Sequence, residues 1–127
     1  MSSTDPPLKS VVWVGSSKGD ISKLPTQVKL VFGHALYLAQ MGRKHPDAKP
    51  LTGIEGGVLE VVEDFDKNSY RAVYKVQLGK IVYVLHVFQK KSKSGKATPK
   101  PDVDLIKSRL KLAKQDYERR TKAKGKA

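Results

Sequence analysis

The sequence contains no cysteine, so neither a disulfide nor a zinc–thiolate site can form. It has no apolar run near the roughly 20 residues that a membrane-spanning helix requires. Its N-terminal stretch, MSSTDPPLKS, lacks the basic and apolar regions of a signal peptide. We therefore expect a soluble, cytoplasmic protein that has no membrane partner.

Signatures of several enzyme classes are also missing. There is no glycine-rich phosphate loop, no P-loop lysine motif and no serine in a nucleophile elbow. The three histidines stand apart from acidic residues at metal-ligand spacing, so we expect neither a metal nor another cofactor. Five carboxylates crowd around one predicted strand and its turn, which does not make a glycosidase cleft: Glu55, Glu60, Glu63, Asp64 and Asp66.

Acidic residues are scarce, with 12 against 25 basic ones and a formal net charge of +13. The excess is concentrated in residues 89–127, which hold 14 basic and four acidic side chains. A concentrated positive field attracts polyanions and speeds encounter with them. Nucleic acid is the commonest such partner and an anionic membrane is the second. A basic surface that only maintains solubility is the alternative.

The chain has 127 residues, the length of a single domain, and we expect flexible residues at 1–8 and a frayed basic tail at 121–127. Runs of β-branched and aromatic residues predict four strands, at residues 9–14, 58–65, 70–78 and 80–88. Apolar residues at three- and four-residue spacing predict two helices, at residues 25–41 and 102–120. A short helical turn is expected at residues 20–24, and loops are expected at residues 43–57 and 89–100.

The connections between the last three predicted strands are tight turns, at residues 66–69 and at Gly79. Such short connections require antiparallel neighbours, and we expect the first strand to join their sheet. The order β-α-β-β-β-α predicts an α+β fold, a small antiparallel sheet of about four strands flanked by helices. Strict alternation along the last strand would place Leu85 and Val87 on one face, and His86 and Phe88 on the other.

Cationic residues lie on or just beyond two adjacent predicted strands: Arg71, Lys75, His86, Lys90 and Lys91. Such groups alone can cleave RNA, because the reaction needs a base, an acid and positive charge at the phosphate. Arginine binds phosphate through forked donors, lysine acts as a point charge, and histidine exchanges protons near neutral pH. An aromatic side chain such as Phe88 or Tyr74 could stack on a base. Ordinary charges at the rim of a sheet are the alternative explanation.

The motifs in this region resemble those of the RelE/HigB toxins of bacterial type II toxin–antitoxin systems, and in particular their phage-derived branch. They are YRAVYKV, a short turn, IVYVLHVFQKK, and a lysine-rich loop with TPK before an amphipathic helix. AKPLTG and GVLEVVED upstream resemble the loop and second strand of the same branch. The resemblance covers about residues 10–117, and the FQKK and TPK motifs are its more specific part.

The resemblance implies a small antiparallel sheet flanked by helices and a metal-independent endoribonuclease that cuts mRNA on the ribosome. It also implies a cognate antitoxin, usually of the helix-turn-helix type, as partner. Arg71 matches the arginine that contacts the scissile phosphate, and Lys90 and Lys91 match the basic residues after the last strand. Phe88 matches an aromatic position beside them, and His86 is included among the catalytic candidates.

Further lysines are expected to bind the RNA backbone without sequence preference: Lys75, Lys93, Lys96 and Lys100. The chain departs from better-studied RelE proteins in carrying Glu60 and Val62 where those have lysines, which leaves the general base open. Some relatives with the same sheet, the ParE toxins, inhibit DNA gyrase. A gyrase inhibitor or a simple RNA-binding protein is therefore the alternative to a nuclease.

Overall fold

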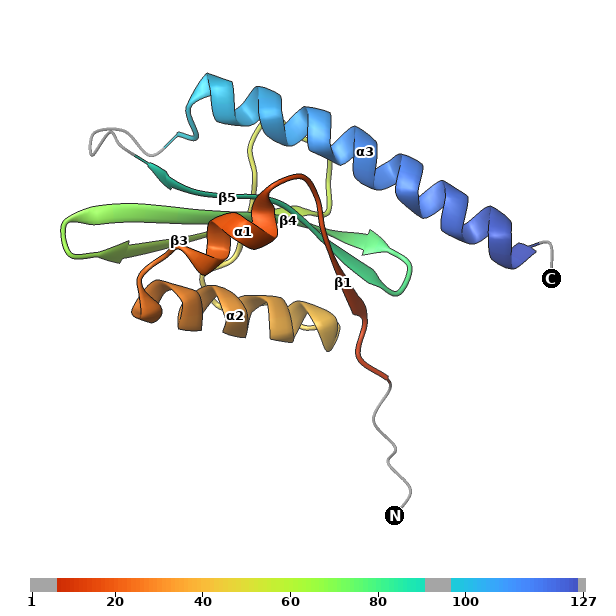
Figure 1. The fold of residues 1–127 in the computed structure, drawn as a ribbon, viewed down its shortest axis with the longest axis horizontal. Helices are drawn as coiled ribbons and strands as arrows, with labels where there is room; N and C mark the ends of the chain where they lie inside the picture. The colour runs from red at the N-terminus through yellow and green to blue at the C-terminus, as the bar shows by residue number, and fades with distance from the viewer. Residues whose placement is uncertain (1–6, 91–96, 126–127) are drawn as a thin grey trace, which may run out of the picture.

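The computed structural model describes residues 7–90 and 97–125, which form one sheet with helices on both of its faces (Figure 1). The expected flexible segment at residues 1–8 lies almost wholly outside the described residues. In chain order the elements are β1 (Ser10–Trp13), α1 (Ser17–Ser22), α2 (Thr26–Gln40), β2 (Lys49–Pro50), β3 (Val58–Phe65), β4 (Asn68–Leu78), β5 (Ile81–Lys90) and α3 (Lys100–Gly125). Within the described residues no helix is long and apolar enough to cross a membrane.

The sheet has the strand order β1-β5-β4-β3-β2, so the expected α+β architecture is confirmed. β3, β4 and β5 are antiparallel neighbours, as their short turns require. Two details differ from the expectation. The sheet has five strands because Lys49–Pro50, in the predicted loop, pairs with β3. β1 runs parallel to β5, which the long connection between them permits.

Each face of the sheet carries its own apolar cluster. α2 packs Val28 and Phe32 against one face, where Tyr74 of β4 and Val82 of β5 are fully buried. α3 lies across the opposite face, as Figure 1 shows, and its buried residues Ile106, Leu110 and Ala113 form the second cluster there. The predicted helices therefore exist because their apolar stripes cover the two sides of one sheet.

The helix boundaries follow local signals to different degrees. α2 ends near the predicted Met41, and Gly42 closes it with a φ of 79° while the Arg43 N–H donates to the Leu38 carbonyl at 2.7 Å. This is the left-handed helix end that glycine favours. α3 does not end at Arg120 as expected but continues to Gly125, into the segment that was expected to fray.

β5 contains a β-bulge at Leu85, which overturns the predicted alternation of faces. Val73 lies opposite His86 and its neighbour Tyr74 lies opposite Val84, so Leu85 is one residue in excess. Before the bulge Tyr83 faces α3, and after it Val87 joins the cluster under α2. The extra residue reverses the side-chain parity, so His86 and Phe88 face α3 together with Leu85.

A polar contact fastens the C-terminal half of α3 to the sheet. The Tyr83 hydroxyl, at the centre of β5, donates to Asp116 Oδ2 at 2.7 Å, and Arg120 Nε donates to the same oxygen at 2.6 Å. The hydrogen bond from Tyr83, with that from Arg120, lowers the pKa of the Asp116 carboxyl. Burial, followed by the hydrogen bond to Asp116, raises the pKa of Tyr83.

The stability that Asp116 contributes should depend on pH. Its folded-state pKa lies below the unfolded value of about 3.9, so the contribution is complete above that pH and is lost as the pH falls through the folded-state pKa. We expect Asp116→Asn to lower the free energy of unfolding near neutral pH, and the gap from wild type to close on acidification. Urea unfolding over a pH series measures this gap. The exposed Asp64→Asn is the control, and a gap that stays constant with pH contradicts the prediction.

Candidate functional site

The α3-facing side of the sheet brings four of the predicted site residues together. Arg71 of β4 lies opposite Phe88 of β5, and Lys90 lies opposite Ser69, two residues before Arg71. His86 precedes Phe88 on the same face because of the bulge at Leu85. We call these four residues, Arg71, His86, Phe88 and Lys90, the strand cluster. It lies beneath the start of α3 and the segment that leads into it.

Arg71 is the centre of the strand cluster and is only 4% exposed. Its Nη1 donates to Glu60 Oε1 and Oε2 at 3.2 and 3.1 Å, and to Thr98 Oγ1 at 3.1 Å. Thr98 in turn donates its hydroxyl to Glu60 Oε2 at 2.7 Å. Glu60 comes from β3, and Thr98 comes from the segment just before α3. The guanidinium is therefore held between a carboxylate of the sheet and a hydroxyl of the lid formed by residues 97–99.

His86 joins the strand cluster to the first turn of α3. Its Nε2 lies 2.8 Å from Asp102 Oδ1, and its ring stacks on Phe88 with centroids 4.4 Å apart and planes 14° from parallel. Its Nδ1 lies 3.5 Å from Arg109 Nη1. Because an arginine nitrogen can only donate and an ionised carboxylate can only accept, Nδ1 faces a donor and Nε2 faces an acceptor.

Arg109 of α3 holds the bulge in place. Its Nη1 donates to the Leu85 carbonyl at 2.9 Å, and its Nη2 donates to Ser16 Oγ at 3.0 Å. The guanidinium lies directly over Gly15, where an added Cβ would be 2.6 Å from Arg109 Nε. Gly15 also has a φ of 60°, a conformation that other residues adopt only with strain. One arginine thus connects α3, the bulge and the start of α1.

The other predicted cations do not join the strand cluster. Lys75 is buried further along β4, where its Nζ contacts Glu55 Oε2 at 3.1 Å and the Gly56 carbonyl at 2.7 Å. Lys100, at the start of α3, is exposed and pairs with Asp104 at 3.2 Å. The remaining three predicted lysines lie outside the described residues: Lys91, Lys93 and Lys96.

Tyr74 is not available to stack on a base, and that part of the prediction is wrong. The side chain is fully buried on the α2 face of β4, away from the strand cluster. Burial raises the pKa of its hydroxyl to about 12. Phe88, which is only half-buried beside His86, is the aromatic residue that this face offers.

Sequence reasoning missed the groups that hold the predicted cations: Glu60, Thr98, Asp102 and Arg109. The sequence singles out Glu60 only as one of five crowded carboxylates and as a departure from a lysine, and it assigns no role to the other three residues. One signal for Glu60 was available, which is the alternation of side chains between the two faces of the sheet. Glu60 lies opposite Val73, so its side chain is on the same face as Arg71 and diagonally beside it. No three histidine or acidic side chains in residues 7–90 and 97–125 come together in a group that could hold a metal ion.

Residues 19–111 match the model of a family described as phage derived protein Gp49-like. The chain belongs to this family, and the phage-derived relationship expected from its motifs is confirmed. It is also similar to a chain in the crystal structure of the toxin–antitoxin complex RelBE2 from Mycobacterium tuberculosis, with a TM-score of 0.46 and 18% sequence identity. That match covers 68% of this chain and 95% of the other. No curated protein matches the chain.

Two glycine substitutions should change stability in opposite directions. Gly15→Ala adds a Cβ against Arg109 at a positive φ, so we expect the free energy of unfolding to fall by about 1–3 kcal/mol. Gly33→Ala, in α2, meets open space, so it should raise that free energy by up to about 1 kcal/mol. Denaturant unfolding of both variants measures the difference. Equal effects would show that Arg109 does not constrain Gly15.

The Arg71–Glu60 pair should be strongly coupled. Glu60→Ala leaves a buried guanidinium without its carboxylate, and we expect a loss of about 3 kcal/mol in the free energy of unfolding. Replacing both residues, as Glu60→Ala with Arg71→Met, should cost less than the sum of the two single changes. Asp64→Ala on the same strand is the exposed control and should cost under about 0.5 kcal/mol. Additive effects in this cycle would show that the pair is not coupled.

Proposed function

We propose that the chain is the toxin of a toxin–antitoxin pair and that it cleaves mRNA on the ribosome without a metal cofactor. The observation that carries the proposal is the strand cluster. One face of the sheet presents an arginine, a carboxylate, a histidine, an aromatic ring and a lysine next to one another. They include what cleavage of RNA by its own 2′-hydroxyl requires, which is a base, an acid and positive charge at the phosphate. Family membership and the motif resemblance point to the same class of protein.

In this reaction the 2′-oxygen attacks the adjacent phosphorus and the bond from phosphorus to the 5′-oxygen breaks. The products are a 2′,3′-cyclic phosphate and a 5′-hydroxyl end. Arg71 would stabilise the added charge on the non-bridging oxygens through its planar, forked donors. Lys90, next to it on the sheet face, would bind the flanking phosphate, as would Lys91.

The proton transfers can be assigned to two further groups. Glu60 is a carboxylate within hydrogen-bond distance of Arg71, so it is placed to accept the proton of the 2′-hydroxyl beside the bound phosphate. His86, in its protonated form, would give the proton on Nε2 to the leaving 5′-oxygen after Asp102 has moved away from that nitrogen. Phe88 would stack on a neighbouring base. The general base that the sequence left open is therefore proposed to be Glu60.

The structure is closed over this site. Thr98 hydrogen-bonds to both Arg71 and Glu60, and Asp102 occupies the His86 nitrogen that would face a substrate. A scissile phosphate would replace Thr98 on Arg71, so the segment before α3 must move when RNA enters. In the proposed reaction this closed arrangement would be the resting state, and binding energy from the RNA backbone would open it.

The antitoxin of such a pair, usually a helix-turn-helix protein, would hold the toxin inactive. Lys93, Lys96 and Lys100 would add backbone affinity that is independent of sequence and weakens with salt. Lys75 is buried against Glu55 and Gly56, so it would not bind RNA directly and would only hold the loop that contains them in place.

The test compares variants induced in bacterial cells. We expect wild type to stop growth and to create new mRNA 5′ ends at codon boundaries, read by primer extension. Arg71→Lys keeps the charge but loses the forked donors, and should lower cleavage by about 10²-fold or more, as should Glu60→Gln. Lys29→Ala, on the outer side of α2, is the control. Circular dichroism of each purified variant confirms that it is folded.

Two outcomes would contradict the proposal. Folded Arg71→Lys and Glu60→Gln proteins that cut mRNA as wild type does would exclude the strand cluster as the catalytic site. Growth arrest with intact transcripts and DNA damage would instead identify a gyrase inhibitor.

A further inference from the structure

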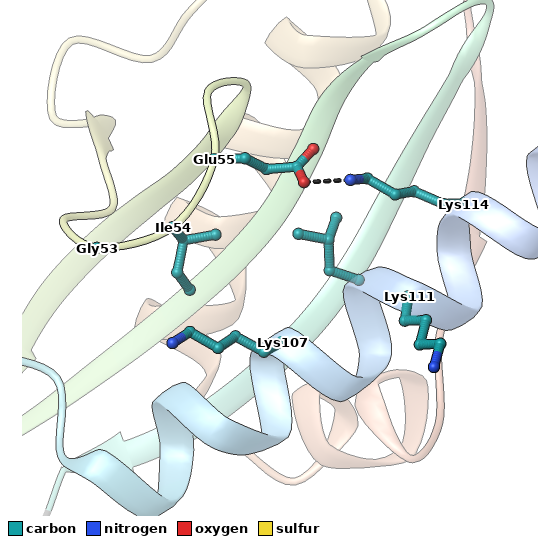
Figure 2. A pocket seen from close by; sticks show the side chains of 7 residues that line it. Gly53, Ile54, Glu55, Lys107, Lys111 and Lys114 are labelled. Carbon is teal, nitrogen blue, oxygen red and sulfur yellow. Dashed lines mark hydrogen bonds and ion pairs between the residues drawn. The ribbon is translucent and has the colours of Figure 1, made fainter.

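A groove outside the strand cluster runs between α3 and the loop before β3, and Figure 2 shows it from close by. Its volume is about 330 Å³. Seven residues line it, and we call it the α3 groove: Gly53, Ile54, Glu55, Lys107, Leu110, Lys111 and Lys114. No residue of the strand cluster takes part in it.

The loop side of the α3 groove is fixed by a buried lysine. Lys75 of β4 donates to the Gly56 carbonyl at 2.7 Å and to Glu55 at 3.1 Å, from beneath the loop. Glu55 also pairs with Lys114 of α3, as the dashed line in Figure 2 marks. The hydrogen bond from Lys114 contributes most to a lowered pKa of Glu55. Glu55, the only carboxylate among the described residues that line the groove, is therefore already paired with two lysines.

The helix side of the groove carries an unbalanced positive charge. Lys107 and Lys111 are exposed, one helical turn apart, and form no ion pair with any other described residue. Between Leu105 and Gln115 the helix has four basic residues and no acidic one. In Figure 2 the Lys107 side chain extends beside Ile54. The rim therefore offers two ammonium groups that form no ion pair with the described residues, since Glu55 pairs with Lys75 and Lys114 instead.

The floor of the groove is apolar. Leu110 is 6% exposed, and Ile54 is partly buried against the cluster under α3. Proteins bind single-stranded RNA by stacking its bases on aromatic rings or arginine planes. None of the described residues that line the groove is aromatic or an arginine. A slot between two aliphatic side chains, with ammonium groups at its rim, instead suits an aliphatic side chain flanked by carboxylates.

We propose that the α3 groove binds an acidic amphipathic segment of a partner protein. One aliphatic side chain of that segment enters between Ile54 and Leu110, and its carboxylates pair with Lys107 and Lys111. Carboxylates one helical turn apart on the partner match the spacing of the two lysines. The site is independent of the proposed nuclease reaction, because the two share no residue.

The probe is a short synthetic helix with glutamates on both sides of a leucine stripe, titrated into the isotopically labelled full-length chain. We expect its NMR shift changes to be concentrated at Ile54, Lys107, Leu110 and Lys111. Replacing Lys107 and Lys111 by Glu should weaken binding about tenfold or more. Two copies of the same charge change away from the groove, Lys29→Glu and Lys18→Glu, should change it by less than about threefold. A peptide with glutamines in place of the glutamates should bind as weakly as the groove variant does.

Three results would overturn the proposal. The first is an acidic peptide that leaves these resonances unchanged. The second is equal weakening by the groove variant and by its control, which would indicate attraction to net charge alone. The third is a short RNA oligonucleotide that shifts the groove resonances while the acidic peptide does not. The same titration with the Arg71→Lys protein separates the two proposals, because loss of the nuclease site should leave peptide binding unchanged.

Discussion

The single extra residue at Leu85 decides what the sheet can present on its α3 side. Without the bulge, strict alternation would turn His86, Phe88 and Lys90 toward the α2 side of the sheet. His86 would then lie on the face of the apolar cluster under α2 and away from Asp102, and a buried polar group without a partner is unfavourable. With the bulge, His86, Phe88 and Lys90 lie on the same face of the sheet as Arg71. Arg109 holds the Leu85 carbonyl, so the helix that covers this face also stabilises the irregularity that organises it.

The fold could be predicted from the sequence wherever local chemistry decides it. The stripes of α2 and α3 and the tight turns around β4 follow from spacing and turn residues alone. The bulge could not be predicted, because β5 is apolar on both faces and its pattern fits either parity. β2 could not be predicted because it has only two residues, one of which is Pro50, and so gives no strand signal. The direction of β1 could not be predicted because it depends on tertiary packing across a long connection.

The cations of the candidate site could be predicted from the sequence, but their acidic partners could not. Cations on neighbouring strands can be read from the chain, whereas the acidic residue that pairs with each one depends on register and on where α3 begins. Arg71 meets Glu60 diagonally across two strands, His86 meets Asp102 from a helix, and Lys75 meets Glu55 from a loop. A basic chain therefore presents less free charge on its sheet than its composition suggests.

The short strand β2 has an effect beyond completing the sheet. It forms one of the two outer edges, is exposed, and consists only of Lys49 and Pro50. Proline has no backbone N–H to offer an incoming chain, and a charged lysine resists being sandwiched between stacked copies. These two residues thus make the part of β3 that they cover, at Leu59 and Glu60, a poor template for a further strand and for growth into fibrils.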